Sequence, residues 1–234
     1  MTLNYTNLLA KLGVGGAHPG SMAVTKKIAE KLPIDSFTKI LDAGCGTGKT
    51  VEYLAEKFDC ETVGLDIDTE MTNQAIQRIE TKPIKATIVQ GSTEQLPFES
   101  DSFDIILSES VTSFTNISKS LAEYARVLHP NGRLVLLEMT NTGWLDKSEI
   151  QELKDFYQVT DVPTKDEWIH LIEKNGFSLM EKETVDPYLG SNYELNHPAK
   201  MNETMLQLMA KHHYLSEKYA DRLGSYLYYC QRKE

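Results

Sequence analysis

The sequence predicts an α/β protein in which buried parallel strands alternate with helices. Short apolar segments at 39–43, 62–66 and 103–107 each run into a glycine-rich or acidic stretch. This pattern is typical of strands that are covered on both faces of a sheet. Segments with apolar residues at helical spacing lie between the strands, as at 49–58 and 121–128. Such alternation favours a parallel sheet with helices packed on it.

The composition restricts the partners that this chain can have. Its 234 residues suffice for one domain with a substantial core, which we expect to span 1–234. A net charge of −10 disfavours nucleic-acid binding, which needs a basic face. Three widely spaced cysteines are typical of reduced thiols, and no apolar run has membrane-spanning length. We expect a cytoplasmic monomer or homodimer without membrane insertion or nucleic-acid partners.

The first strand ends in the motif Asp42-Ala43-Gly44-Cys45-Gly46-Thr47-Gly48, and a helical pattern follows it. Glycine permits sharp turns and close approach of a ligand, and the backbone N–H groups at a helix start can face that ligand. The motif is an acidic residue followed by G-x-G-x-G. It departs from the dinucleotide fingerprint G-x-G-x-x-G at Lys49 and from the phosphate loop G-x-x-x-x-G-K-[ST] at Ala43.

The second and third strands also end in polar residues. Asp66 follows the glycine turn by about twenty residues, the distance at which a carboxylate reaches a ribose in such units. We expect Ile67 to lie beside an adenine and Asp68 to cap the next helix. The strand at 86–90 is followed by the polar residues Ser92, Thr93 and Glu94.

Polar residues also follow the fourth strand, namely Ser108, Glu109, Ser110 and Thr112. Ligands bind beyond the carboxyl ends of parallel strands, so we expect these residues near the reacting groups. Glu109 is a candidate base or a partner for an amino group; the alternative is a loop acid in water. The glycine-rich segment before the first long helix is either a plain linker or a lid that brings His18, Gly20 and Thr25 to the ligand.

The chain resembles the class I S-adenosylmethionine (SAM)-dependent methyltransferases, in particular those of ubiquinone and menaquinone biosynthesis. The motifs that carry the resemblance occur in the same order as in that family, at 42–48, 64–68, 91–98, 103–108 and 126–136. The resemblance implies a Rossmann-like, seven-stranded, mostly parallel sheet whose last strand is antiparallel. Helices would cover both faces, with an N-terminal helical cap or lid over 1–37, a SAM-binding core over 38–140, and a C-terminal helical insertion on the substrate side within 141–234.

The resemblance also implies that SAM donates a methyl group to a small molecule by in-line displacement, leaving S-adenosylhomocysteine (SAH). The acceptor atom, oxygen, nitrogen or carbon, stays open. The residues expected to bind the cofactor are Asp42, Ala43, Gly44, Cys45, Gly46, Gly48, Asp66, Ile67, Ser92, Thr93, Glu94, Ser108 and Glu109. The catalytic candidates are Glu109 and His18, and the substrate-binding candidates are His18, Gly20, Ser110, Thr112 and Tyr193. We expect no metal. Family members usually carry an acid where this chain has Ser92.

Two alternatives stay open at this point. Gly48-Lys49-Thr50 fits a P-loop nucleotide hydrolase, which would also need an aspartate at a nearby strand end; the fourth strand ends in Ser108-Glu109 instead. Ser92 leaves room for a SAM-binding protein without catalysis.

The remaining elements carry local expectations. Thr164 and Glu167 form a capping box. Ser21 is a candidate cap for the first long helix, and both tryptophans, Trp144 and Trp168, are expected in the core.

Overall fold

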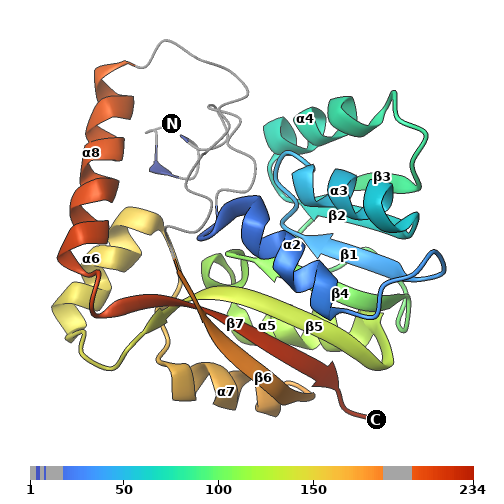
Figure 1. Ribbon diagram of the computed structural model, residues 1–234. Helices are drawn as coiled ribbons and strands as arrows, with labels where there is room; N and C mark the ends of the chain where they lie inside the picture. The colour runs from blue at the N-terminus through green and yellow to red at the C-terminus, as the bar shows by residue number, and fades with distance from the viewer. Residues whose placement is uncertain (1–3, 6–7, 9–17, 187–201) are drawn as a thin grey trace.

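The computed structural model describes residues 4, 5, 8, 18–186 and 202–234. A seven-stranded sheet of order β3-β2-β1-β4-β5-β7-β6 forms its centre (Figure 1). The strands are β1 (Lys39–Ala43), β2 (Glu61–Asp66), β3 (Ala86–Gln90), β4 (Phe103–Glu109), β5 (Leu128–Asn141), β6 (Phe177–Val185) and β7 (Leu223–Arg232). The helices are α2 (Ser21–Lys31), α3 (Lys49–Phe58), α4 (Thr69–Ile79), the short η1 (Thr112–Phe114), α5 (Ile117–Val127), α6 (Lys147–Tyr157), α7 (Lys165–Lys174) and α8 (Glu203–Lys218).

The strand directions confirm the predicted topology. β1, β2, β3, β4 and β5 pair in parallel, and β7 pairs antiparallel with both β5 and β6. Asp42 lies level with Gly64 in β2 and with Leu107 in β4. The polar residues after these strands therefore meet at one edge of the sheet, where a ligand site is expected.

Two apolar layers cover the sheet, as the alternation of side chains in a strand requires. Ile40 packs with α2 and α3 on one face. Its neighbour Leu41 packs on the other face with α5 and α7, where the Trp168 side chain is fully buried. The parallel strands are thus apolar on both sides, which explains their nearly continuous hydrophobic sequences.

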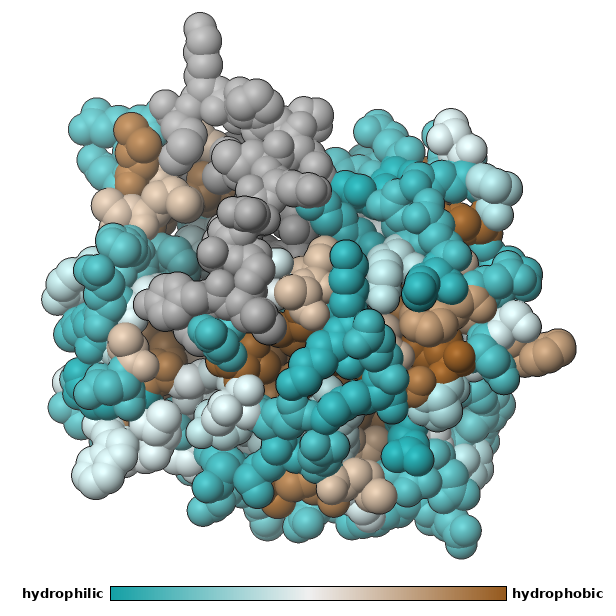
Figure 2. All heavy atoms as spheres, in the orientation of Figure 1, coloured by the Kyte–Doolittle hydropathy of each residue, from teal (hydrophilic) through white to brown (hydrophobic). Residues whose placement is uncertain are grey.

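A third, smaller apolar cluster joins α6 to α8 at the side of the molecule away from α3 and α4 (Figure 1). Its members include Leu153 and Tyr157 from the α6 side and Leu215 and Tyr219 from the end of α8. Hydrophilic residues predominate on the described surface seen in Figure 2. No helix in the described ranges is both long and apolar enough to cross a membrane.

Several local predictions have outcomes here. The Thr164 and Glu167 side chains form the expected capping box of α7, and Trp168 is in the core. Ser21 is not a cap: α2 begins after Gly20, which has a φ of 80°, and no side chain in the described part of the chain caps it. Trp144 is 77% exposed in the loop before α6, so its expected core position is wrong. The first part of the N-terminal cap or lid expected over 1–37 lies largely outside the described residues.

Candidate active site

A cavity of about 1330 Å³ lies at the carboxyl ends of β1, β2, β4 and β5. Pockets for one drug-sized ligand usually measure roughly 300–1,000 Å³, so this cavity has room for more than one molecule. Its lining comes from the loops after β1 to β4 on one side and from α6, α8 and the start of β7 on the other.

The glycine loop is tightly packed at one end and open at the other. The backbone N–H groups of Gly44 and Cys45 both donate to the Leu65 carbonyl, at 2.7 and 2.9 Å. Gly44 has a φ of +82°, and a Cβ there would lie 2.2 Å from Val111 Cγ2. At Gly46 a Cβ would meet nothing within 4 Å. The loop therefore leaves open space at Gly46, beside the cavity.

Asp66 connects this loop to the next one. One of its carboxylate oxygens accepts the Gly46 N–H at 2.9 Å, and the other accepts the Asp68 N–H at 2.9 Å. Burial raises the pKa of Asp66, and these two bonds oppose the rise. Asp68 caps α4, as predicted, by accepting from Glu70 and Met71 N–H. Next to Asp66, Ile67 lines the cavity with its side chain largely exposed.

Asp42 is a deeply buried acid of the cavity wall. It is 3% exposed, and its Oδ2 atom has no hydrogen-bond partner among the described residues. Burial raises the pKa of Asp42 well above its usual range, and the nearby carboxylates of Glu109 and Asp66 raise it further. Three acids thus face each other in a poorly solvated place, an arrangement that favours a cationic ligand over an anionic one.

Glu109 belongs to a buried polar group that joins β4 to α2 and the segment before it. The Thr25 hydroxyl donates to the Glu109 carboxylate, with Oγ1 at 3.0 and 3.1 Å from the two oxygens. His18 Nε2 lies 3.3 Å from the same hydroxyl and 3.7 Å from Glu109 Oε1. A more distant bond from Thr50 reaches Glu109 at 3.4 Å. His18 and Glu109, predicted separately from the sequence, therefore lie together at the cavity.

The structure brings most of the predicted residues to this cavity. Those that line it are His18, Asp42, Gly44, Cys45, Gly46, Asp66, Ile67, Ser92, Thr93, Glu94, Glu109 and Ser110. Within this set, Thr93 Oγ1 is bonded to Ser120 Oγ at 3.0 Å, and Glu94 accepts the Asn116 N–H at 2.9 Å. These two groups are already engaged within the protein.

Five predicted residues do not line the cavity. Gly48 faces α4, where a Cβ would lie 2.9 Å from that of Ala75, and Gly20 faces Val24. Ala43, Ser108 and Thr112 are fully buried, and the hydroxyls of the latter two bond to each other at 2.9 Å. Tyr193 lies outside the described residues.

The sequence did not point to Glu138 or to the far end of the cavity. Glu138 lies in β5, where it accepts hydrogen bonds from the backbone of residues 111–113. Tyr5, Tyr157, His212 and Tyr219 line the end near α6 and α8. Two of these residues come from helices far apart in the chain, so only the folded structure brings them together.

Comparison with known proteins identifies the family. A methyltransferase domain family matches residues 41–136. The uncharacterized methyltransferase YodH of Bacillus subtilis is 33% identical over 223 residues, which are 94% of this chain and 95% of YodH. The chain belongs to the SAM-dependent methyltransferase family. The fungal O-methyltransferase rstn1 of Aspergillus nomiae is 27% identical to this methyltransferase over 195 residues, 76% of this chain and 87% of the fungal protein.

The fold of this chain is also that of solved methyltransferase structures. Phosphoethanolamine N-methyltransferase 2 of Haemonchus contortus, in complex with SAM, superimposes with a TM-score of 0.81 at 19% identity. The alignment covers 98% of this chain and 57% of the nematode chain. The methyltransferase sheet, predicted from the sequence, is thus confirmed.

The residues of the cavity fit the family's cofactor. SAM carries a cationic sulfonium and an amino group, and Asp42 Oδ2, which bonds to none of the described residues, offers a buried acceptor for a cationic donor. The open space at Gly46 allows a ligand to approach the backbone. The P-loop alternative has no such support, because Asp42, Asp66 and Glu109 would repel a polyphosphate.

Proposed function

We propose that this methyltransferase transfers the methyl group of SAM to a small-molecule acceptor, at an oxygen, nitrogen or carbon atom. The observation that carries the proposal is the extent of the cavity. It continues from the glycine loop past Glu109 to α6 and α8, with room beyond that of one ligand. The fungal relative is named an O-methyltransferase and the nematode structure a phosphoethanolamine N-methyltransferase, and the names of both support a small acceptor.

Bound SAM supplies a methyl group that is already activated, so the protein's task is to orient two molecules and exclude water. We assign Asp66 to the ribose hydroxyls, because its two oxygens retain acceptor capacity beside their backbone bonds. Asp42 would hold a cationic group of the cofactor through Oδ2. Ile67 and Ser92 would lie along the adenine, with the Ser92 hydroxyl in place of the usual acid.

We further propose that Glu109 and His18 act on the acceptor. Glu109 is a buried carboxylate that lines the cavity, and the Thr25 hydroxyl fixes its orientation. An acceptor that must lose a proton would pass it to Glu109, with His18 Nε2 close enough to share the hydrogen bond network. Ser110, after β4, would contact the acceptor.

We propose a single domain over 1–234, with the cap, core and substrate-side parts at the boundaries given above. The cytoplasm is the proposed location, because Cys45, Cys60 and Cys230 are all free thiols. A monomer or homodimer without a nucleic-acid partner fits the net charge of −10.

The test measures where the methyl group goes. SAM labelled in its methyl group is incubated with the protein and with an extract of its cells, separated beforehand into small molecules, protein and nucleic acid. We expect label only in the small-molecule fraction, and loss of that label with Glu109→Gln. Label in protein or nucleic acid would refute a small-molecule acceptor. The absence of label from every fraction would favour a SAM-binding protein without catalysis.

A further inference from the structure

The far end of the cavity has its own chemistry. Tyr5 stacks on the His212 imidazole with ring centres 4.7 Å apart and an angle of 26° between the planes. The same tyrosine meets Tyr157 edge to face at 5.4 Å and 84°. All three rings line the cavity, together with the apolar side chains of Phe114, Met139, Val159, Met209 and Leu223. Such walls suit a flat, apolar molecule, because ring stacking and a polarisable methionine both favour one.

A polar pair lies within these apolar walls. The Tyr157 hydroxyl is 3.0 Å from His212 Nδ1, and Tyr157 comes from α6 whereas His212 comes from α8. Burial lowers the pKa of His212, with a further contribution from His213, so the imidazole is neutral at pH 7. A neutral imidazole has one donor and one acceptor nitrogen, so with Nδ1 bonded to Tyr157 the other nitrogen can bond to a ligand.

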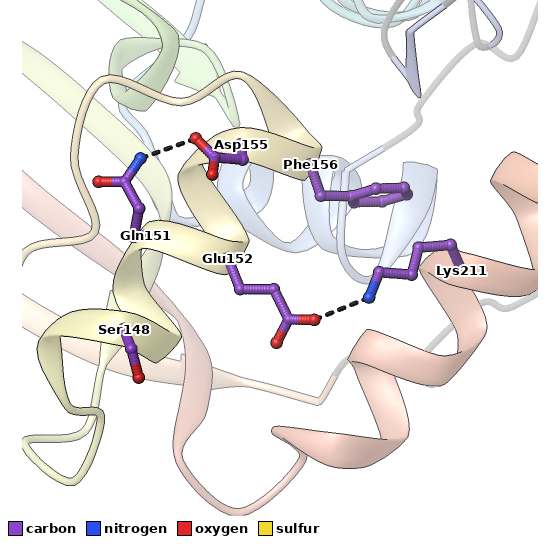
Figure 3. A pocket seen from close by; sticks show the side chains of 6 residues that line it. All are labelled: Ser148, Gln151, Glu152, Asp155, Phe156 and Lys211. Carbon is purple, nitrogen blue, oxygen red and sulfur yellow. Dashed lines mark hydrogen bonds and ion pairs between the residues drawn. The ribbon is translucent and has the colours of Figure 1, made fainter.

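The pair is not required to hold the two helices together. Glu152 of α6 accepts from Lys211 at 2.7 Å, from Lys218 at 2.6 Å and from the Tyr219 hydroxyl at 2.6 Å. Figure 3 shows the Glu152 carboxylate and the Lys211 amine facing each other across the groove between α6 and α8. The apolar cluster of Leu153, Leu215 and Tyr219 adds to this contact.

The charges of the cavity also select among ligands. Its described walls carry Asp42, Asp66, Glu109 and Glu138 at the ends of the central strands, where an anionic acceptor would be repelled. At the far end, the carboxylate of Glu217 lies 3.3 Å from His213 Nε2, and both side chains are largely exposed. The Tyr157–His212 pair therefore presents neutral hydrogen-bonding groups between apolar walls, and the Glu217 carboxylate at this end lies beside His213 in a largely exposed position.

We propose that Tyr157 and His212 bind the methyl acceptor and that this acceptor is an uncharged aromatic compound with a hydrogen-bonding substituent such as a hydroxyl group. The inference rests on the proposed function, since it assigns the part of the cavity beyond the cofactor to the acceptor. The rings of Tyr5, Tyr157 and His212 hold the acceptor ring, and the Tyr157–His212 pair bonds its substituent. An aromatic amine in its cationic form or a phosphate ester is the wrong class.

The experiment uses the full chain saturated with SAH and a set of small aromatic fragments. Each ring is supplied in three forms, with a hydroxyl, a phosphate or an aminomethyl group, and binding is measured by saturation-transfer NMR and calorimetry. We expect the hydroxyl form to bind about tenfold or more tightly than the two charged forms of the same ring, because an unpaired charge is costly in an apolar site. Preference for a charged form, or no binding of any hydroxyl fragment, would overturn the proposal.

Variants separate binding from helix packing. Tyr157→Phe should weaken the hydroxyl fragments by about fivefold to tenfold, the loss expected for one hydrogen bond, with SAH affinity unchanged. The matched control is Tyr214→Phe, because Tyr214 is a half-exposed tyrosine of α8, the helix that carries His212, and it does not line the cavity. Equal binding in Tyr157→Phe and the control would overturn the role of the pair. A failure of SAH itself to stabilise the protein would instead refute the proposed function.

Discussion

Replacement of Asp66 by alanine tests the cofactor end of the cavity directly. Asp66 lies at the end of β2 and holds the Gly46 and Asp68 N–H groups at 2.9 Å each. If its carboxylate also binds the ribose, Asp66→Ala removes hydrogen bonds to a charged acceptor, worth about 1.5–3 kcal/mol. That loss corresponds to a dissociation constant for SAH about 10-fold to 150-fold higher.

The assay is calorimetric titration of SAH and of an SAH analogue without the ribose 2′-hydroxyl. The wild-type protein should bind the analogue more weakly than SAH, and Asp66→Ala should bind the two equally, because the partner of the hydroxyl is gone. Asp155→Ala serves as the control, since Asp155 is exposed on α6 and lines only the groove of Figure 3. A change of less than twofold in SAH affinity would remove Asp66 from the ribose site. So would a variant that still prefers SAH over the analogue by the same factor as the wild-type protein.

Three further predictions concern turnover and stability. Glu109→Gln keeps the shape of the side chain but removes the base, so turnover should fall about 10²-fold or more with SAH affinity nearly unchanged; equal turnover would rule out this role. Glu152→Gln should lower the melting temperature by about 2–4 °C at pH 7, the effect of about 1 kcal/mol. Hydrogen bonds from lysines hold the pKa of Glu152 down to about 2, so its stabilisation is complete above pH 4.5 and is lost as the pH falls towards 2. The difference between variant and wild type should therefore shrink over that range, and a constant difference would contradict the assignment. Gly44→Ala should destabilise the protein more than Gly143→Ala: both residues have positive φ, but a Cβ clashes with Val111 only at Gly44. Equal melting temperatures would show that the clash is relieved at no cost.

Local chemistry made the fold predictable from the sequence. The parallel strands are nearly continuous apolar segments, and Asp68 and Thr164 cap their helices through their own side chains. The errors have a physical cause as well. The turn before α2 uses positive φ at Gly20 and Ser21, and a backbone turn of this kind leaves no place for a serine cap. Trp144 is exposed because the loop before α6 buries its neighbour Leu145 in the third apolar cluster, to which Trp144 itself does not belong.

The site was predictable where the topology of the sheet determines it. The carboxyl ends of β1, β2 and β4 lie at one edge, so Asp42, Asp66 and Glu109 had to meet there. The aromatic end depends on how α8 packs on α6, and helix–helix contacts between distant segments leave no periodic pattern in a sequence. The sequence therefore does not single out His212 as a site residue, although its ring bonds to Tyr157 within the cavity.

Glu138 in β5 is a further residue whose contacts become visible only in the folded structure, because its partners lie at residues 111–113. An acid inside the apolar strand β5 is unusual, because a buried carboxylate is costly unless it is bonded. Its oxygens accept the N–H groups of Val111, Thr112 and Ser113 at 3.2, 2.8 and 3.2 Å, and the Ser113 hydroxyl at 2.6 Å. These are the donors at the start of η1, where a negative charge is favourable. Burial raises the pKa of Glu138, and the four bonds counteract this rise. The bonded loop also carries Val111, whose side chain packs against the positive-φ backbone of Gly44. One acid in β5 thus fixes the loop that packs against the glycine turn, so a residue of the fifth strand stabilises the cofactor end of the cavity through residues 111–113.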